Sequence, residues 1–333
     1  EEGVRGYDAP RDTWVTGADL SKVKAQFLNF KEEEMEELDV VTDVSFDGTK
    51  VGELYEVTST FCRVGAALLK VAKRRDTGEE VVLKVSSAEL DQLYDRAVCE
   101  ADSAWMERCA GVPGVPVVRE AHALDSVYCV VLEKVTGQDM VTWASRALDS
   151  GTLTVGRVRA VVGQMVEIAR ALHARNIMHR GLVPGNLLVD KADRVTVMGF
   201  EFACEVSGPG SSLTDPWAIV PWCQPAELAA RCPYGVAADM WTIGCTLYLL
   251  TCAAPPFYHR NNMKMSLMIR QAKIPADCPA KGPLADFLQG LLTKDADKRL
   301  SAEAAAKHAW LAGPMDESTP ISGSLEHCAS HLY

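Results

Sequence analysis

The chain of 333 residues lacks the features that mark several classes of protein. No run of 18 or more apolar residues occurs, so we expect no transmembrane helix. Basic residues are outnumbered by acidic ones, 34 to 45, and the net charge of −11 argues against a nucleic-acid or anionic-membrane surface. Only seven His occur and none of the eleven Cys stands in a CxxC pair, so a structural zinc site is not expected.

The cysteines allow two interpretations. They suit small buried side chains in a reducing cytosol, and they equally suit a secreted protein with a few disulfides and at least one free thiol, because their number is odd. The chain opens on Glu1 rather than Met, so we expect a trimmed form from which targeting information is missing.

Hydrophobic periodicity divides the chain into four parts. Residues 1–50 form an N-terminal extension in which a helix is predicted from Asp19. Residues 51–134 contain short β-branched segments and one helical segment, and residues 135–314 are mostly helical. Residues 315–333 are polar and irregular and are assigned to a C-terminal tail.

One motif in the helical part carries chemistry. Residues 179–186 read H-R-G-L-V-P-G-N, which resembles the protein-kinase catalytic loop H-R-D-L-x-x-x-N except at Gly181. Thirteen residues after Asn186, Gly199-Phe200-Glu201 stands where kinases carry D-F-G. The resemblance implies a bilobal α+β kinase fold, with a small strand-rich N-lobe and a larger helical C-lobe.

Further matches follow in the order that kinases have. Residues 81–84 resemble V-A-I-K, and Glu100 in the next helix is suitably placed as the ion-pair partner of Lys84. Residues 224–227 stand where A-P-E is expected. The resemblance assigns structural roles to five residues: His179, Phe200, Glu227, Asp239 and Arg299. Among them, Glu227 and Arg299 are predicted to form a buried ion pair.

The residues that transfer phosphate in kinases are replaced. Gly181 stands where the catalytic Asp accepts the substrate proton, Gly199 where an Asp holds Mg²⁺, and Val183 where the catalytic-loop Lys is found. The glycine-rich loop is also missing, since Cys62, Val64 and Ala67 fall on its glycine positions in the ungapped register. These substitutions predict a pseudokinase that is not an enzyme, with no catalytic residue, no metal and no cofactor.

Two functions remain open. The first is a scaffold or allosteric partner that binds another protein and binds no nucleotide. The second is an atypical nucleotide-binding transferase with rearranged metal ligands. It would use the pocket remnants Lys84, Glu100 and Asn186, together with the Glu201 carboxylate two residues from the lost Asp.

Within kinases, the G-F-E motif, the absent glycine-rich loop, the N-terminal extension and the many cysteines resemble the secreted apicomplexan rhoptry-kinase group. That resemblance implies secretion into the parasitophorous vacuole or cyst wall and a role in assembly. In such an oxidising compartment, two disulfides become candidates from the placement of the residues. They are Cys252–Cys278, in loops expected to flank one small helix, and Cys223–Cys232, which bracket a short turn.

Overall fold

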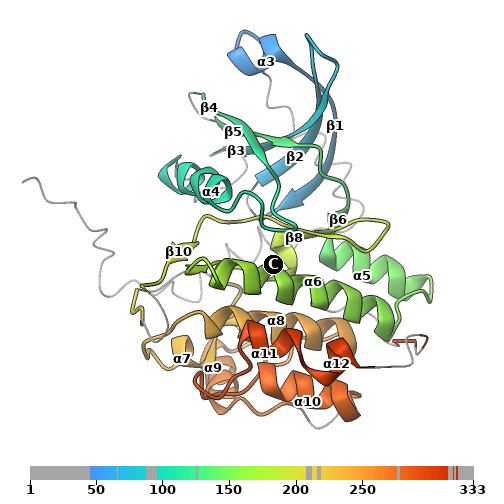
Figure 1. Cartoon of the computed structure of the whole chain (residues 1–333), viewed down its shortest axis with the longest axis vertical. Coiled ribbons are helices and arrows are strands. Elements are labelled where there is room, and N and C mark those ends of the chain that lie inside the picture. Colours follow the sequence, from blue (N-terminus) through green and yellow to red (C-terminus); the bar gives the residue numbers. More distant parts are fainter. Residues whose placement is uncertain are drawn as a thin grey trace, which may run out of the picture.

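The structure, a computed structural model, describes residues 46–65, 67–87, 96–124, 127–207, 212–215, 219–275, 278–313, 318 and 320–321. The helix predicted from Asp19 lies outside these residues. Figure 1 shows an upper lobe built on a sheet and a lower lobe built of helices. This confirms the bilobal α+β fold that the motifs predict.

The upper lobe is a five-stranded antiparallel sheet in the order β1-β2-β3-β5-β4. Its elements are α3 (Lys50–Leu54), β1 (Tyr55–Val64), β2 (Ala67–Arg74), β3 (Glu80–Ser87), α4 (Arg96–Arg108), β4 (Val118–Ala123) and β5 (Val127–Glu133). Every residue of β5 except Glu133 is buried, and neighbouring β3 is almost as buried, because both strands are central in the sheet. Helix α4 packs on β4 and β5.

The lower lobe surrounds α8 (Ala237–Cys252), whose residues 238–251 are all buried. A helix that is apolar on all sides belongs in the middle of a core. The other helices are α5 (Met140–Asp149), α6 (Val155–His173), α7 (Ala226–Ala229), α9 (Asn262–Gln271), α10 (Gly282–Leu291), α11 (Ala302–Ala306) and α12 (Ala309–Ala312). None of the described helices is long and apolar enough to cross a bilayer.

Short strands at the junction of the lobes carry the functional loops. Strands β6 (Gln138–Asp139), β8 (Leu187–Val189) and β9 (Val195–Val197) form one sheet, and β7 (Ile177–Met178) pairs with β10 (Cys204–Glu205). Two 3₁₀ turns, η1 (Pro184–Asn186) and η2 (Pro221–Cys223), complete the segment.

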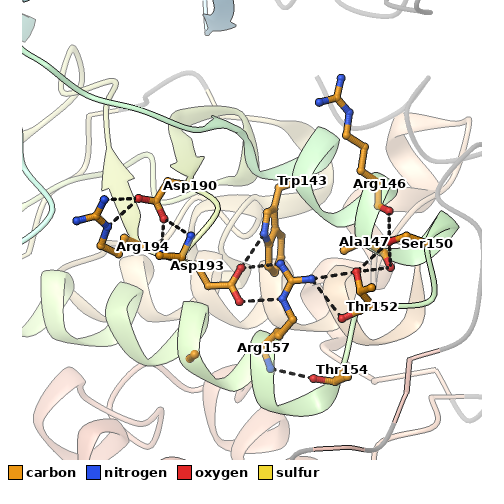
Figure 2. Close-up of polar contacts among 12 residues, drawn as sticks. Trp143, Arg146, Ala147, Ser150, Thr152, Thr154, Arg157, Asp190, Asp193 and Arg194 are labelled. Atoms are coloured by element: carbon orange, nitrogen blue, oxygen red, sulfur yellow. Dashed lines mark hydrogen bonds and ion pairs between the residues drawn. The ribbon is translucent and has the colours of Figure 1, made fainter.

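A polar network fixes the β8–β9 turn against α5 and α6, which contribute Trp143 and Arg157 (Figure 2). The Asp193 carboxylate accepts hydrogen bonds from Arg157 at 2.7 and 2.8 Å and from the Trp143 indole at 3.0 Å. The Arg157 guanidinium also lies over the Trp143 ring, 5.1 Å from its centre. A bidentate pair of this kind is geometrically specific, and together with the Trp143 hydrogen bond it holds α5 and α6 against the β8–β9 turn.

Candidate functional site

The catalytic-loop motif is anchored on a buried carboxylate. Asp239, at the start of α8, accepts hydrogen bonds from the backbone N–H groups of His179 and Arg180 and lies 2.9 Å from the ring of His173. Burial favours the neutral form of this carboxyl, but the contacts with His173 and His179 hold its pKa below the ordinary value. Asp239 therefore fixes the backbone that leads into the loop.

His179, the first residue of the catalytic-loop motif, is buried and packs against an aromatic ring. The His179 ring meets the ring of Phe200 edge to face, with 4.4 Å between their centres. Burial lowers the pKa of the His179 imidazole to about 4, so the ring is neutral at neutral pH. His179 thus joins the catalytic loop to the G-F-E segment by packing.

Asn186 fills the space in which the two missing aspartates would stand. Its side-chain amide donates to the carbonyl of Gly181 at 3.1 Å. A Cβ on Gly181 would lie 2.9 Å from Asn186 Nδ2, and a Cβ on Gly199 would lie 2.5–2.7 Å from three atoms of the same amide. Gly199 also has a φ of +74°, a region that favours glycine. Both glycines therefore belong to this packing of Asn186.

Lys84, a buried lysine of β3, pairs with Asp102, which corrects the prediction that it pairs with Glu100. Lys84 Nζ lies 2.6 Å from Asp102 Oδ2, and both side chains are more than 90% buried. Glu100 is half exposed and binds Arg96. Side chains two positions apart on a helix point about 200° away from each other, so α4 can turn only one of the two acids, Glu100 or Asp102, towards the core.

Asp102 also reaches the G-F-E segment. Its second oxygen accepts the backbone N–H of Phe200 at 2.7 Å. The Glu201 carboxyl lies beside this pair. Burial raises the pKa of Glu201; the charge of Lys84 opposes the shift and that of Asp102 adds to it. Burial alone would lower the pKa of Lys84, but the two carboxyl groups raise it above its ordinary value.

The tip of the β1–β2 hairpin reaches the catalytic loop. The N–H of Gly65 donates to the carbonyl of Gly185 at 3.3 Å. A Cβ on Gly65 would lie 3.4 Å from Asn186 Oδ1 and 4.0 Å from Glu201 Oε1. Val64, at a position where the glycine-rich loop has glycine, is buried. The hairpin that cradles phosphates in kinases here touches the opposite lobe with its own backbone.

These residues do not fit a magnesium–nucleotide complex. The position of the catalytic-loop Lys is the buried Val183, and Asn186 turns its amide to Gly181. Among the described residues, no group of three or more His, Cys, Asp or Glu side chains is placed to hold a metal ion. Val183 and Gly199 thus stand where kinases carry the catalytic-loop Lys and a metal-binding Asp, and the Asn186 amide is hydrogen-bonded within the chain.

Two ion pairs hold the segment that follows. Arg180 forks onto Asp215 at 2.8 and 3.0 Å, and the Tyr234 hydroxyl donates to the same carboxylate. Asp215 is not among the residues predicted for the site, since its segment has no motif, although a buried Arg in a motif needs an acidic partner. Farther on, Glu227 and Arg299 form a buried fork at 2.7 and 2.8 Å.

The ten cysteines that the structure describes are free thiols. Cys252 and Cys278 nevertheless lie with their sulfur atoms 3.5 Å apart. The other predicted pair is not brought together, because the buried Cys223 lies beside Cys245, while the exposed Cys232 thiol donates to the carbonyl of Ala230. Spacing along the chain did not reveal that η2 turns Cys223 towards α8.

Comparison with known proteins returns protein kinases. The chain is 26% identical to the calcium/calmodulin-dependent protein kinase type 1B of Rattus norvegicus over 83% of this chain and 80% of that protein. It is 25% identical to the liver/testis gamma catalytic chain of phosphorylase b kinase of Homo sapiens, over 79% and 68%. It is 33% identical to serine/threonine-protein kinase 36 of Mus musculus, over 53% of this chain but only 13% of that protein.

These relatives overturn the prediction that the chain is not an enzyme. All three are named as kinases or as the catalytic chain of one. The prediction was wrong because it inferred the activity of the whole chain from a few substituted positions, chiefly Gly181 and Gly199, in a fold that otherwise keeps the kinase frame.

The family model named "Protein kinase domain" matches residues 64–311. The match begins at the tip of β1 and ends in α12, so it spans both lobes and every site residue described above. The chain therefore belongs to the protein kinase family.

Proposed function

We propose that this kinase-family domain acts by binding another protein, as a scaffold or allosteric partner, and that its interlobe cleft is closed to nucleotide by its own residues. The observation that carries the proposal is the contact of Gly65 with Gly185 over the Asn186 amide. A phosphate group would have to displace this backbone contact, and Val64 cannot move away from it without leaving the core.

Nucleotide titration tests the closed cleft. Millimolar ATP with Mg²⁺ is expected to leave the melting temperature unchanged, because the phosphate path is filled. A ligand at 100 times its dissociation constant would stabilise the fold by about 2.7 kcal/mol, which thermal-shift measurement detects readily. A saturable shift that the Lys84→Ala variant abolishes would show instead that the cleft admits nucleotide.

One observation favours a second function, a nucleotide-binding transferase with rearranged ligands. Glu201 lies beside Lys84 and Asp102 and about 4 Å from the Gly65 position, so its carboxylate could replace the one lost at Gly199. The same titration decides between the functions: a Mg²⁺-dependent shift that Glu201→Gln removes, with Lys84 intact, supports the transferase.

Secretion, by resemblance to the rhoptry-kinase group, is part of the proposal, with the parasitophorous vacuole or cyst wall as its location. The pair Cys252–Cys278 supports it, because an oxidising compartment would join two sulfur atoms that already lie 3.5 Å apart.

We expect non-reducing peptide mapping of protein produced by a secretory host to find Cys252 joined to Cys278. In the chain-entropy view, such a bridge adds about 2–4 kcal/mol to the free energy of unfolding. The Cys252→Ser variant should lose that stability, whereas Cys232→Ser, an exposed control, should not. Alkylation of every cysteine without reductant would contradict the bridge and leave secretion without support from the residues.

A further inference from the structure

Helix α9 carries an outer face that is apolar and basic. Met263 is 82% exposed and Leu267 is 47% exposed, and one helical turn separates them. Lys264 and Arg270 are exposed beside them. We call these four residues the α9 outer face. A soluble surface tolerates scattered apolar residues, but two large ones stacked on a single helix form a contact stripe.

The opposite side of α9 fixes this face in place. Met265 and Ile269 are buried, and the helix packs on α7 and η2. The Asn261 side chain caps the first turn by accepting the N–H of Lys264. The outer face is therefore a rigid presentation of side chains, which lowers the cost of binding a partner.

The charge around α9 is opposite to that of the rest of the chain. Residues 251–276 contain no Asp or Glu, although the chain as a whole has 45 acidic residues and a net charge of −11. The same stretch contributes Arg260, Lys264, Arg270 and Lys273, all exposed. An acidic segment with apolar side chains is the partner that such a surface fits.

The chain itself contains a segment of that chemistry. Residues 32–39 read E-E-E-M-E-E-L-D, in which Met35 and Leu38 are the apolar members. We propose that this acidic segment of one copy binds the α9 outer face of a second copy. The proposal deepens the protein-binding role proposed above and rests on it.

The acidic segment is too close along the chain to α3 to reach α9 of its own copy, which favours binding to a second copy. Phe46 leads into α3 at the top of the N-lobe, whereas α9 lies at the bottom of the C-lobe (Figure 1). The eight residue-to-residue steps from Leu38 to Phe46 extend at most about 28 Å. A folded chain of about 270 residues has a radius of gyration of about 18 Å, so the ends of its long axis lie roughly 50 Å apart.

Sedimentation velocity on the full chain tests the proposal. The wild-type chain should self-associate at low salt and less so in 0.5 M NaCl (about a 4 Å screening length), because salt screens exposed charges. The double variant Lys264→Glu/Arg270→Glu should weaken association at least tenfold. Lys73→Glu/Lys191→Glu, which changes the net charge equally at exposed sites far from α9, should leave it unchanged.

A charge swap identifies the partner segment. The variant Glu33→Lys/Glu34→Lys should also fail to self-associate. Its equimolar mixture with Lys264→Glu/Arg270→Glu should form dimers, since the segment of each variant is then opposite in charge to the α9 outer face of the other. A wild-type chain that stays monomeric at all concentrations overturns the proposal. Self-association that persists in both the Lys264→Glu/Arg270→Glu and the Glu33→Lys/Glu34→Lys variants also overturns it. Either result leaves the contacts of the closed cleft, and the nucleotide test, unaffected.

Discussion

The Arg299→Ala variant is expected to lose about 3–5 kcal/mol of free energy of unfolding, because removal of one partner from a buried ion pair strands the other charge. The Arg299 side chain is fully buried and that of Glu227 is 7% exposed. Arg299 also donates to the carbonyls of Thr293 and Ala237, and its guanidinium lies 5.0 Å from the ring centre of Trp241. One substitution therefore removes the partner of a buried carboxylate and a donor to two part-buried carbonyls.

Chemical denaturation measures this loss, and the neighbouring residue supplies the control. Lys298 forms an ion pair with Asp295, but its side chain is 78% exposed. Exposed pairs contribute less than about 1 kcal/mol, so Lys298→Ala should change the midpoint little. Equal losses from Arg299→Ala and Lys298→Ala would contradict the structural role of the Glu227–Arg299 pair.

The fold was predictable because its evidence is distributed along the chain. Motifs at residues 84, 179–186, 199–201, 227 and 299 stand in kinase order, and each is tied to a position in the two lobes. Residues 135–314, predicted to be mostly helical, likewise contain the helices α5 to α12.

The site was less predictable, since its contacts join distant residues. Sequence identifies Gly181 and Gly199 as substitutions, but only the structure places Asn186 against both of them. The choice between Glu100 and Asp102 needed the helical phase of α4, which Asp102, Ser103 and Met106 mark as its buried side.

The position of Asp102 on the buried side of α4 leads to the second large expected effect on stability. The Asp102→Ala variant is expected to lose about 3–5 kcal/mol of free energy of unfolding. The change removes the carboxylate that lies 2.6 Å from the buried Lys84 ammonium, leaving the Glu201 carboxyl beside it, and removes the acceptor of the Phe200 N–H. Asp102 is thus the residue that connects α4, β3 and the G-F-E segment, and its loss should loosen all three together.

Glu100→Ala is the matched control, because it removes an acid two residues away whose side chain is 52% exposed. Surface substitutions of this kind usually change stability by less than about 0.5 kcal/mol. A double variant, Lys84→Met/Asp102→Leu, should lose less than Asp102→Ala alone, since neither member of the Lys84–Asp102 pair is then buried without the other. If Glu100→Ala proves as costly as Asp102→Ala in equilibrium denaturation, the ion pair of the N-lobe has been assigned to the wrong acid.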